Sequence, residues 1–132
     1  MIKAVIDTNV LVSAFWTRNR LSPTVRIANA IARDVFTPVY ALEMISEYRE
    51  VLLRTKFNFS ANEVNALIDH IIAYGELMTP MESEGYFPDP QDKVFFCTAL
   101  ADDAHLVTGN MKHYPRADFV VTPAQFCELL GI

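Results

Sequence analysis

The feature that most constrains the fold is a regular alternation of short apolar runs with predicted helix starts. Strands that alternate with helices form βαβ units, whose parallel sheets are covered by helices on both faces. We therefore expect an α/β fold, a three-layer α/β/α domain with a central, mostly parallel sheet of about four or five strands. The runs with β-strand character are residues 2–6, 34–36, 77–79, 106–108 and 119–121.

Proline marks most of the predicted helix starts, because its missing N–H does no harm at the first helical position. A further start is Ser60, which opens a Ser-Ala-Asn-Glu capping box. These signals predict helices over residues 38–54 and 90–103, and another helix over residues 9–16 follows the first strand. A proline follows an N-capping residue at Ser22-Pro23, Thr37-Pro38, Asp89-Pro90 and Thr122-Pro123.

The length of 132 residues fits one domain, residues 1–132. No uncharged run approaches the length that crosses a bilayer, and Asp7 interrupts the apolar start before a signal-peptide core could form. Cys97 and Cys127 lie outside any CxxC motif and are expected to be small buried residues. We therefore expect a soluble, cytoplasmic protein with no membrane partner.

Charge is divided unevenly along the chain. The formal net charge of −5 does not suggest a nucleic-acid binder. However, residues 1–60 contain eight Lys/Arg and five Asp/Glu, whereas residues 61–132 contain three and eleven. The N-terminal half could therefore present a basic surface, although charge alone favours an ordinary solvated one. The candidate cations are Arg18, Arg20, Arg26, Arg54 and Lys56.

Asp7 directly follows the first predicted strand and precedes a predicted helix. In parallel α/β sheets, ligands bind outside the carboxyl ends of the strands. A carboxylate there is well placed for a metal ion or for contact with a phosphate group. Capping of the following helix explains the residue equally well.

Two more acids lie at unusual positions on predicted helices. Glu47 lies on the flank of the apolar stripe of helix 38–54, where a carboxylate could reach an inner cleft. The alternative is that Glu47 is a border residue whose carboxylate extends into solvent. Asp92 shares the angular position of Phe95 on helix 90–103, and a charge in line with a buried face is costly unless paired or coordinated. A capping role in the first turn is the alternative for Asp92.

The strand predicted at residues 106–108 ends in Gly109 and Asn110. Glycine permits an unusual backbone angle or a close approach, and the Asn110 amide could face an ion, a water or its own backbone. A plain turn is the alternative.

Four motifs occur together in a recognisable order. They are D-T-N-V-L-V-S-A at 7–14, S-E-Y-R-E-V-L-L-R-T-K-F at 46–57, D-P-Q-D-K-V-F-F-C-T-A-L-A at 89–101 and L-V-T-G-N-M-K-H-Y-P at 106–115. Together they resemble a PIN domain over nearly the whole chain. Within that family the chain is most similar to the prokaryotic VapC-like toxins of toxin–antitoxin systems.

The resemblance implies a metal-dependent ribonuclease. It makes Asp7, Glu47 and Asp92 catalytic residues and metal ligands, with Asn110 at a fourth catalytic position that is often Asp in the family. Asn110 weakens the case for a second metal ion, and Asp118 could substitute only if the chain loops back. The supporting polar residues would be Thr8, Asn9 and Thr108.

The implied cofactor is Mg²⁺ or Mn²⁺, because oxygen ligands suit hard cations. Such an ion orients and acidifies a water for in-line attack on a phosphodiester. The implied partners are an RNA substrate, a cognate antitoxin and a second copy in a homodimer. Phosphates that flank the cleavage site could be held by Arg18, Arg20, Arg54 and Lys56. Phe15 and Trp16 could stack on a base, although packing in the core or in a dimer is favoured.

Two other classes of function remain open. A non-catalytic relative with the same fold could bind RNA or protein, and Asn110 and the net acidity slightly favour it. Another α/β phosphate enzyme fits less well. A haloacid-dehalogenase-like phosphatase needs Asp-x-Asp after the first strand, where Asp7 is followed by Thr8 and Asn9. A receiver domain needs an acidic pair at that strand end, and the pair is absent.

Overall fold

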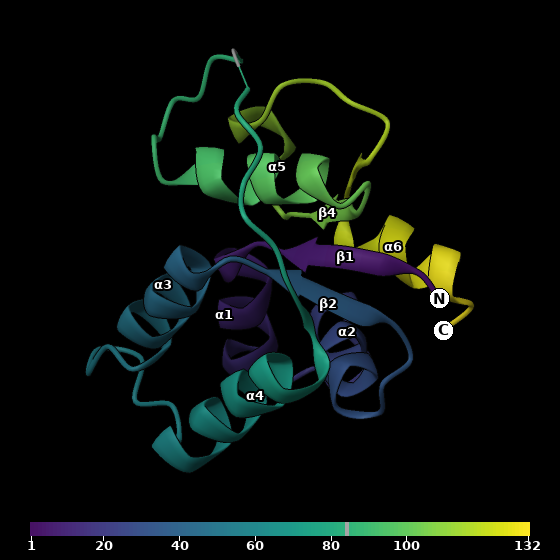
Figure 1. The fold of residues 1–132 in the computed structure, drawn as a ribbon. Coiled ribbons are helices and arrows are strands. Elements are labelled where there is room, and N and C mark those ends of the chain that lie inside the picture. The colour runs from purple at the N-terminus through teal and green to yellow at the C-terminus, as the bar shows by residue number, and fades with distance from the viewer. Residues whose placement is uncertain (84) are drawn as a thin grey trace.

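Parallel strands form the centre of the fold, in the order β3-β2-β1-β4-β5 (Figure 1). The structure is a computed structural model that describes residues 1–83 and 85–132. The five-stranded sheet confirms the predicted α/β fold with a parallel sheet. Its strands are β1 (Lys3–Ile6), β2 (Thr37–Tyr40), β3 (Glu76–Leu77), β4 (His105–Val107) and β5 (Val120–Val121).

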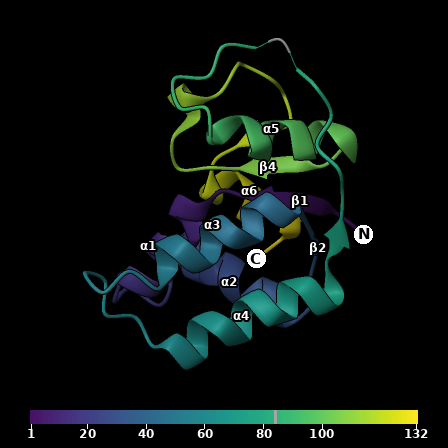
Figure 2. The same ribbon diagram turned by 60° about the vertical axis from the view of Figure 1, so that its left-hand side comes forward.

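Helices cover both faces of this sheet, which gives the expected three layers. Helix α5 lies on one side of β1 and β4, and helices α1, α2 and α4 lie on the other side (Figures 1 and 2). Helix α6 packs against α2, and α3 contacts both α1 and α5. The helices are α1 (Thr8–Trp16), α2 (Pro23–Ala32), α3 (Leu42–Leu52), α4 (Ala61–Tyr74), α5 (Asp92–Ala101), the 3₁₀ helix η1 (Met111–His113) and α6 (Pro123–Leu130).

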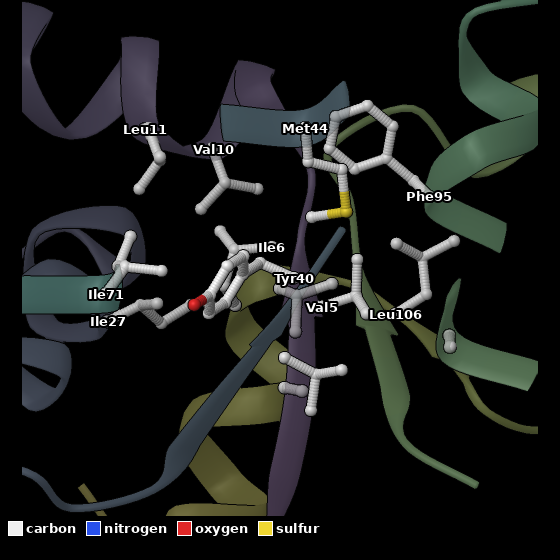
Figure 3. Close-up of a cluster of buried hydrophobic side chains, with 14 of the residues drawn as sticks. Val5, Ile6, Val10, Leu11, Ile27, Tyr40, Met44, Ile71, Phe95 and Leu106 are labelled. Carbon is white, nitrogen blue, oxygen red and sulfur yellow. The ribbon is translucent and has the colours of Figure 1, made fainter. Parts of the chain in front are cut away.

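The hydrophobic core lies on both sides of β1. Val5 and Ile6 are consecutive and both fully buried, as expected for a strand covered on two faces. Each such side chain stabilises the fold by about 1.5–3 kcal/mol relative to exposure. Figure 3 shows Ile6 among Val10, Leu11, Ile27 and Ile71 from α1, α2 and α4, with Met44, Phe95 and Leu106 on the side of α3, α5 and β4.

The order of the strands reverses between β1 and β4. From β1 the sheet extends to β2 and β3 on one side, and β4 and β5 lie on the other. Ligands of such sheets bind in the crevice at this reversal, outside the carboxyl ends of the strands. The backbone N–H of Asp7 donates to the carbonyl of Val107 at 2.9 Å, so the ends of the two strands are joined there.

One region differs from the prediction. Residues 34–36, predicted as a strand, lie in the turn after α2, where Asp34 has a φ of 57°. Thr37-Pro38, predicted to start a helix, instead begins β2, and α3 starts at Leu42.

Pro38 fits inside this strand for a specific reason. The N–H of Thr37 points to β1, where it donates to Ile2, so the nitrogen of Pro38 faces β3. Pairing with β3 begins only at Val39. The missing N–H of proline therefore costs no ladder hydrogen bond.

Three other helix starts agree with the prediction. Helices α2 and α6 begin at Pro23 and Pro123, and Thr122 forms a full capping box. Ser60 accepts the N–H of Glu63 at 3.3 Å. Helix α5 begins two residues later than predicted, at Asp92. Both cysteines are buried and free, and no helix in residues 1–83 or 85–132 is long and apolar enough to cross a membrane.

Candidate functional site

Asp7 lies at the centre of a polar cluster at the carboxyl edge of the sheet. Its side chain is buried, with 5% exposed. One carboxylate oxygen, Oδ2, accepts hydrogen bonds from Thr108 Oγ1 at 2.8 Å, Tyr114 OH at 3.0 Å and Asn9 Nδ2 at 3.2 Å. These bonds fix the orientation of the carboxylate and take up one of its two oxygens. Asn9 and Thr108, which were predicted as supporting residues, both contact Asp7.

Glu47 reaches the same cluster from α3. Its Oε2 accepts a hydrogen bond from Thr8 Oγ1, at the first residue of α1. The neighbouring Tyr48 is buried and donates its hydroxyl to the carbonyl of Ile6, the last residue of β1. Tyr48 therefore anchors α3 at the end of β1, and this brings Glu47 beside Thr8.

Asp92 enters the cluster from the first turn of α5. Its Oδ2 is buried and has no hydrogen-bond partner among the residues that the structure describes. His113 Nδ1 lies 3.4 Å from this oxygen, an ion pair when the imidazole is protonated. A buried carboxylate oxygen without a partner is costly. Asp92 is therefore the acid in the cluster with the greatest need of a cation.

Burial is the largest cause of a raised pKa at all three acids. The pKa of Asp92 rises to about 6, because the charges of Asp7, Asp89 and Glu47 add to the effect of burial while His113 opposes it. Asp7 likewise raises the pKa of Glu47, although Thr8 opposes the rise through its hydrogen bond. Residues from three distant parts of the sequence are thus electrostatically coupled at one edge of the sheet.

We expect the metal-free protein to lose stability as pH rises from about 4 to above 6. Asp92 binds its proton more tightly in the folded state than in the unfolded state, since its pKa rises from 3.8 to about 6. The stabilisation is therefore fully present below pH 4 and is lost through pH 6. Asp7 and Glu47 shift in the same direction. The midpoint of urea unfolding, measured in EDTA between pH 4 and 7, gives the slope of stability against pH. Asp92→Asn should make this slope smaller. A slope unchanged by Asp92→Asn would contradict the prediction.

The donor chemistry of the cluster fits a hard divalent cation. Carboxylate oxygens are the ligands that Mg²⁺ and Mn²⁺ prefer, and Mg²⁺ usually takes only one or two carboxylates and keeps several waters. Oδ2 of Asp92, which has no hydrogen-bond partner among the described residues, could serve as one ligand atom. As they stand, however, no three acidic, histidine or cysteine side chains in the described part of the chain converge closely enough to hold one ion.

Asn110 lies on the turn after β4 and is exposed. Its backbone N–H donates to Thr108 Oγ1 at 3.0 Å, and the N–H of Gly109 donates to Asn9 Oδ1 at 3.2 Å. This turn is therefore tied to the Asp7 cluster by two hydrogen bonds. Asp118 is exposed and borders a separate hollow, together with Lys112 and Tyr114.

Tyr114 and Asp89 belong to the site but were not predicted from the sequence. Tyr114 reaches Asp7 because η1 turns the chain back toward β1, and no pattern in the sequence indicated that return. Asp89 was interpreted only as a cap; it accepts the N–H of Gln91 at 3.0 Å and also raises the pKa of Asp92. The run of acids at 89 and 92 could have indicated this second role.

The four predicted phosphate-binding cations lie in different local surroundings. Arg54 is held by Glu50 through hydrogen bonds of 2.8 to 3.2 Å. Arg20 borders a hollow between α2 and α4. Arg18 borders a different hollow at the end of α1, where Lys56 lies over the ring of Phe57.

Comparisons with known proteins support the fold and identify the family. The sequence profile of the PIN domain matches residues 3–112, which include Asp7, Glu47, Asp92 and Asn110. The structure is similar to the crystal structure of VapBC2 from Rickettsia felis bound to a DNA fragment from their promoter. The similarity has a TM-score of 0.57 at 15% identity and covers 92% of this chain and 97% of that chain. No curated protein matches the sequence. Because the profile covers most of the chain, from β1 into η1, the chain belongs to the PIN-domain family.

Proposed function

We propose that the protein is a metal-dependent endoribonuclease that hydrolyses RNA phosphodiester bonds. The observation that carries the proposal is the electrostatic interaction of Asp7, Glu47 and Asp92 at the carboxyl edge of the sheet, where a buried oxygen of Asp92 has no hydrogen-bond partner among the described residues. Membership of the PIN-domain family supports the same conclusion. Perturbed acids in an edge crevice are typical of catalytic sites.

In this proposal Asp7, Glu47 and Asp92 hold Mg²⁺ or Mn²⁺. A bound divalent ion supplies an acidified water and neutralises charge on the phosphate. The residues of the chain itself orient the ligands. Three donors hold Oδ2 of Asp7, which leaves Oδ1 for the ion, and Thr8 holds one oxygen of Glu47. Asn110, on the exposed turn, offers a neutral amide to a phosphate oxygen.

We further propose that the protein acts in the cytoplasm as the toxin of a toxin–antitoxin pair and forms a homodimer. The structurally similar VapBC2 was crystallised as a complex with promoter DNA, which supports an antitoxin partner for this chain. Co-expression with the product of a neighbouring small reading frame, followed by co-purification, tests the pairing.

Cleavage of a mixed single-stranded RNA pool tests the nuclease activity. The purified protein is incubated with Mn²⁺, with Mg²⁺ and with EDTA, and the products are resolved on a denaturing gel. Cleavage with either ion and none in EDTA is expected. The same rate in EDTA would contradict metal dependence.

A non-catalytic RNA-binding or protein-binding module is the second candidate. Two observations favour it: the acids do not close into a three-ligand group in the described part of the chain, and Asn110 stands at a position that is often Asp in the PIN-domain family. RNA binding by the folded protein, without cleavage under any ionic condition, would support this candidate.

Charge reversal at Arg18 and Arg20 together is expected to weaken RNA binding without unfolding the protein, because both side chains are exposed. For every cation that no longer holds a phosphate, the salt dependence of binding should fall by about 0.7 on a log–log plot. The single variants Arg18→Glu and Arg20→Glu show which of the two hollows contributes to RNA binding, because each arginine borders a different one. Filter binding over a salt series measures the affinity for RNA and its salt dependence. Unaltered affinity would mean that Arg18 and Arg20 do not contact the RNA.

A further inference from the structure

A shallow, open hollow lined by aromatic side chains lies at the end of α1 remote from the acidic cluster. It has a volume of about 750 Å³. Phe15 and Trp16 come from α1, and Phe57 and Phe59 come from the connection between α3 and α4. The rings of Phe57 and Phe59 stack at 5.0 Å between centroids with 5° between their planes. Trp16 meets Phe57 edge-on at 6.1 Å.

Core packing explains only part of this group. Phe15 and Phe59 pack against the hydrophobic core, in agreement with the packing role favoured for Phe15. Trp16, in contrast, is 65% exposed. A large exposed ring beside two stacked rings forms an apolar patch, and such patches mark interaction sites.

The charges around the hollow favour a polyanion as its occupant. Arg18 borders it, and Lys56 Nζ lies 5.2 Å from the centroid of the Phe57 ring. No acidic residue in the described part of the chain lines it, although the whole chain carries a net charge of −5. Aromatic rings flanked by cations are the pattern of sites for single-stranded nucleic acid, where bases stack on the rings and cations follow the phosphates. The rings alone would serve an apolar partner, and the cations would then have no role.

Local backbone hydrogen bonds build the hollow before any ligand binds. The N–H of Phe57 donates to the carbonyl of Arg54 at 3.1 Å, and that of Asn58 donates to Thr55 at 3.2 Å. Asn58 has a φ of 53°, a left-handed conformation that asparagine tolerates better than most residues. A turn fixed in this way loses little conformational entropy on binding.

Helix α1 joins this hollow to the acidic cluster. Thr8 at its first residue bonds Glu47, and Trp16 is its last residue. A helix of nine residues spans about 13 Å. Helix α3 contacts α1, and the connection beyond α3 lies near the far end of α1 (Figures 1 and 2). We propose that the hollow is a stacking subsite for bases of single-stranded RNA, one length of α1 away from the proposed cleavage site; this rests on the proposed nuclease function.

The single tryptophan of the chain makes the subsite directly observable. Fluorescence excited at a wavelength that tyrosine absorbs little reports on Trp16 alone, because the chain also contains five tyrosines. The probe is a fluorescein-labelled, mixed-sequence single-stranded RNA, added in EDTA so that the proposed metal-dependent cleavage does not interfere. We expect the unlabelled RNA to quench the emission of Trp16. This quenching should saturate over the same range of RNA concentration as the anisotropy of the fluorescein-labelled RNA.

Variants separate stacking from general binding. Trp16→Ala should weaken single-stranded RNA binding by about tenfold or more, since base–aromatic stacking is of that order. Trp16→Tyr keeps an aromatic ring and should retain most of the affinity. Tyr74→Ala is the matched control, because Tyr74 is also 65% exposed but ends α4, outside the hollow. A duplex of the same sequence, whose bases are not free to stack, should bind wild type and Trp16→Ala alike.

Three outcomes would overturn the subsite. The first is RNA binding that neither quenches Trp16 nor weakens in Trp16→Ala. The second is no RNA binding at all. The third is a concentration-dependent change in Trp16 emission without RNA, matched by a dimer in sedimentation that Trp16→Ala abolishes, which would assign the surface to a second copy. The cleavage assay decides the nuclease function separately: quenching without metal-dependent cleavage would support the subsite and contradict the nuclease.

Discussion

Replacing Asp92 with Asn is expected to reduce metal-dependent RNA cleavage by about a hundredfold or more. The substitution keeps the shape of the side chain but removes the charge of the acid whose buried oxygen has no hydrogen-bond partner among the described residues. A metal site contributes several kcal/mol to stabilisation of a transition state, and about 2.7 kcal/mol corresponds to a hundredfold in rate. Initial rates of cleavage at saturating Mn²⁺ measure the loss, and circular dichroism confirms the fold.

Asp7→Asn should produce a loss of the same order, because Asp7 is the proposed ligand that the most hydrogen bonds hold in place. Asp118→Asn is the matched control. Asp118 is an exposed acid that borders a separate hollow, so its charge should be dispensable for cleavage. Full activity in Asp7→Asn and Asp92→Asn would locate the activity at another site or in a contaminant. Loss of cleavage in Asp118→Asn alone would contradict the proposed set of catalytic acids.

Saturating Mn²⁺ is expected to raise the melting temperature of the wild-type protein by about 10 °C. A ligand at a hundred times its dissociation constant stabilises the folded state by about 2.7 kcal/mol, and each kcal/mol is worth roughly 3–5 °C for a chain of this size. The physical reason is that burial and, after it, mutual repulsion raise the pKa values of Glu47 and Asp92, and a bound cation offsets both. Thermal unfolding followed by circular dichroism, with Mn²⁺ and with EDTA, measures the shift.

Asp92→Asn provides the internal comparison for this shift. In EDTA above pH 6 the variant should melt higher than wild type, because it removes a charge from the cluster, and Mn²⁺ should stabilise it less. A wild-type melting temperature unaffected by Mn²⁺, with Asp7→Asn more stable in both conditions, would mean that no ion binds.

The position of Asp7 could be predicted from the sequence because two general rules agree there. An acid after a buried apolar run marks a strand end, and ligands of parallel sheets bind at such ends. Glu47 and Asp92 followed from helical periodicity, since a carboxylate on or beside a buried stripe needs a partner. Each of these arguments uses only neighbouring residues.

Tyr114 could not be predicted, because its contact with Asp7 depends on the path of the chain after β4. Pro38 was misinterpreted for a related reason. The preference of proline for the first turn of a helix is a local rule, whereas its fit in β2 depends on where β3 begins to pair. Periodicity and capping act within a few residues, but the order of strands in a sheet is set by the whole chain.

The hydrogen bonds that hold Asp7 also determine when the site can form during synthesis. Thr108 and Tyr114 lie 101 and 107 residues after Asp7. The ribosome must therefore have made most of the chain, and released it from the exit tunnel, before the first acid is oriented. Under the proposed ribonuclease function, this order would keep the nascent chain inert toward the messenger from which it is being translated.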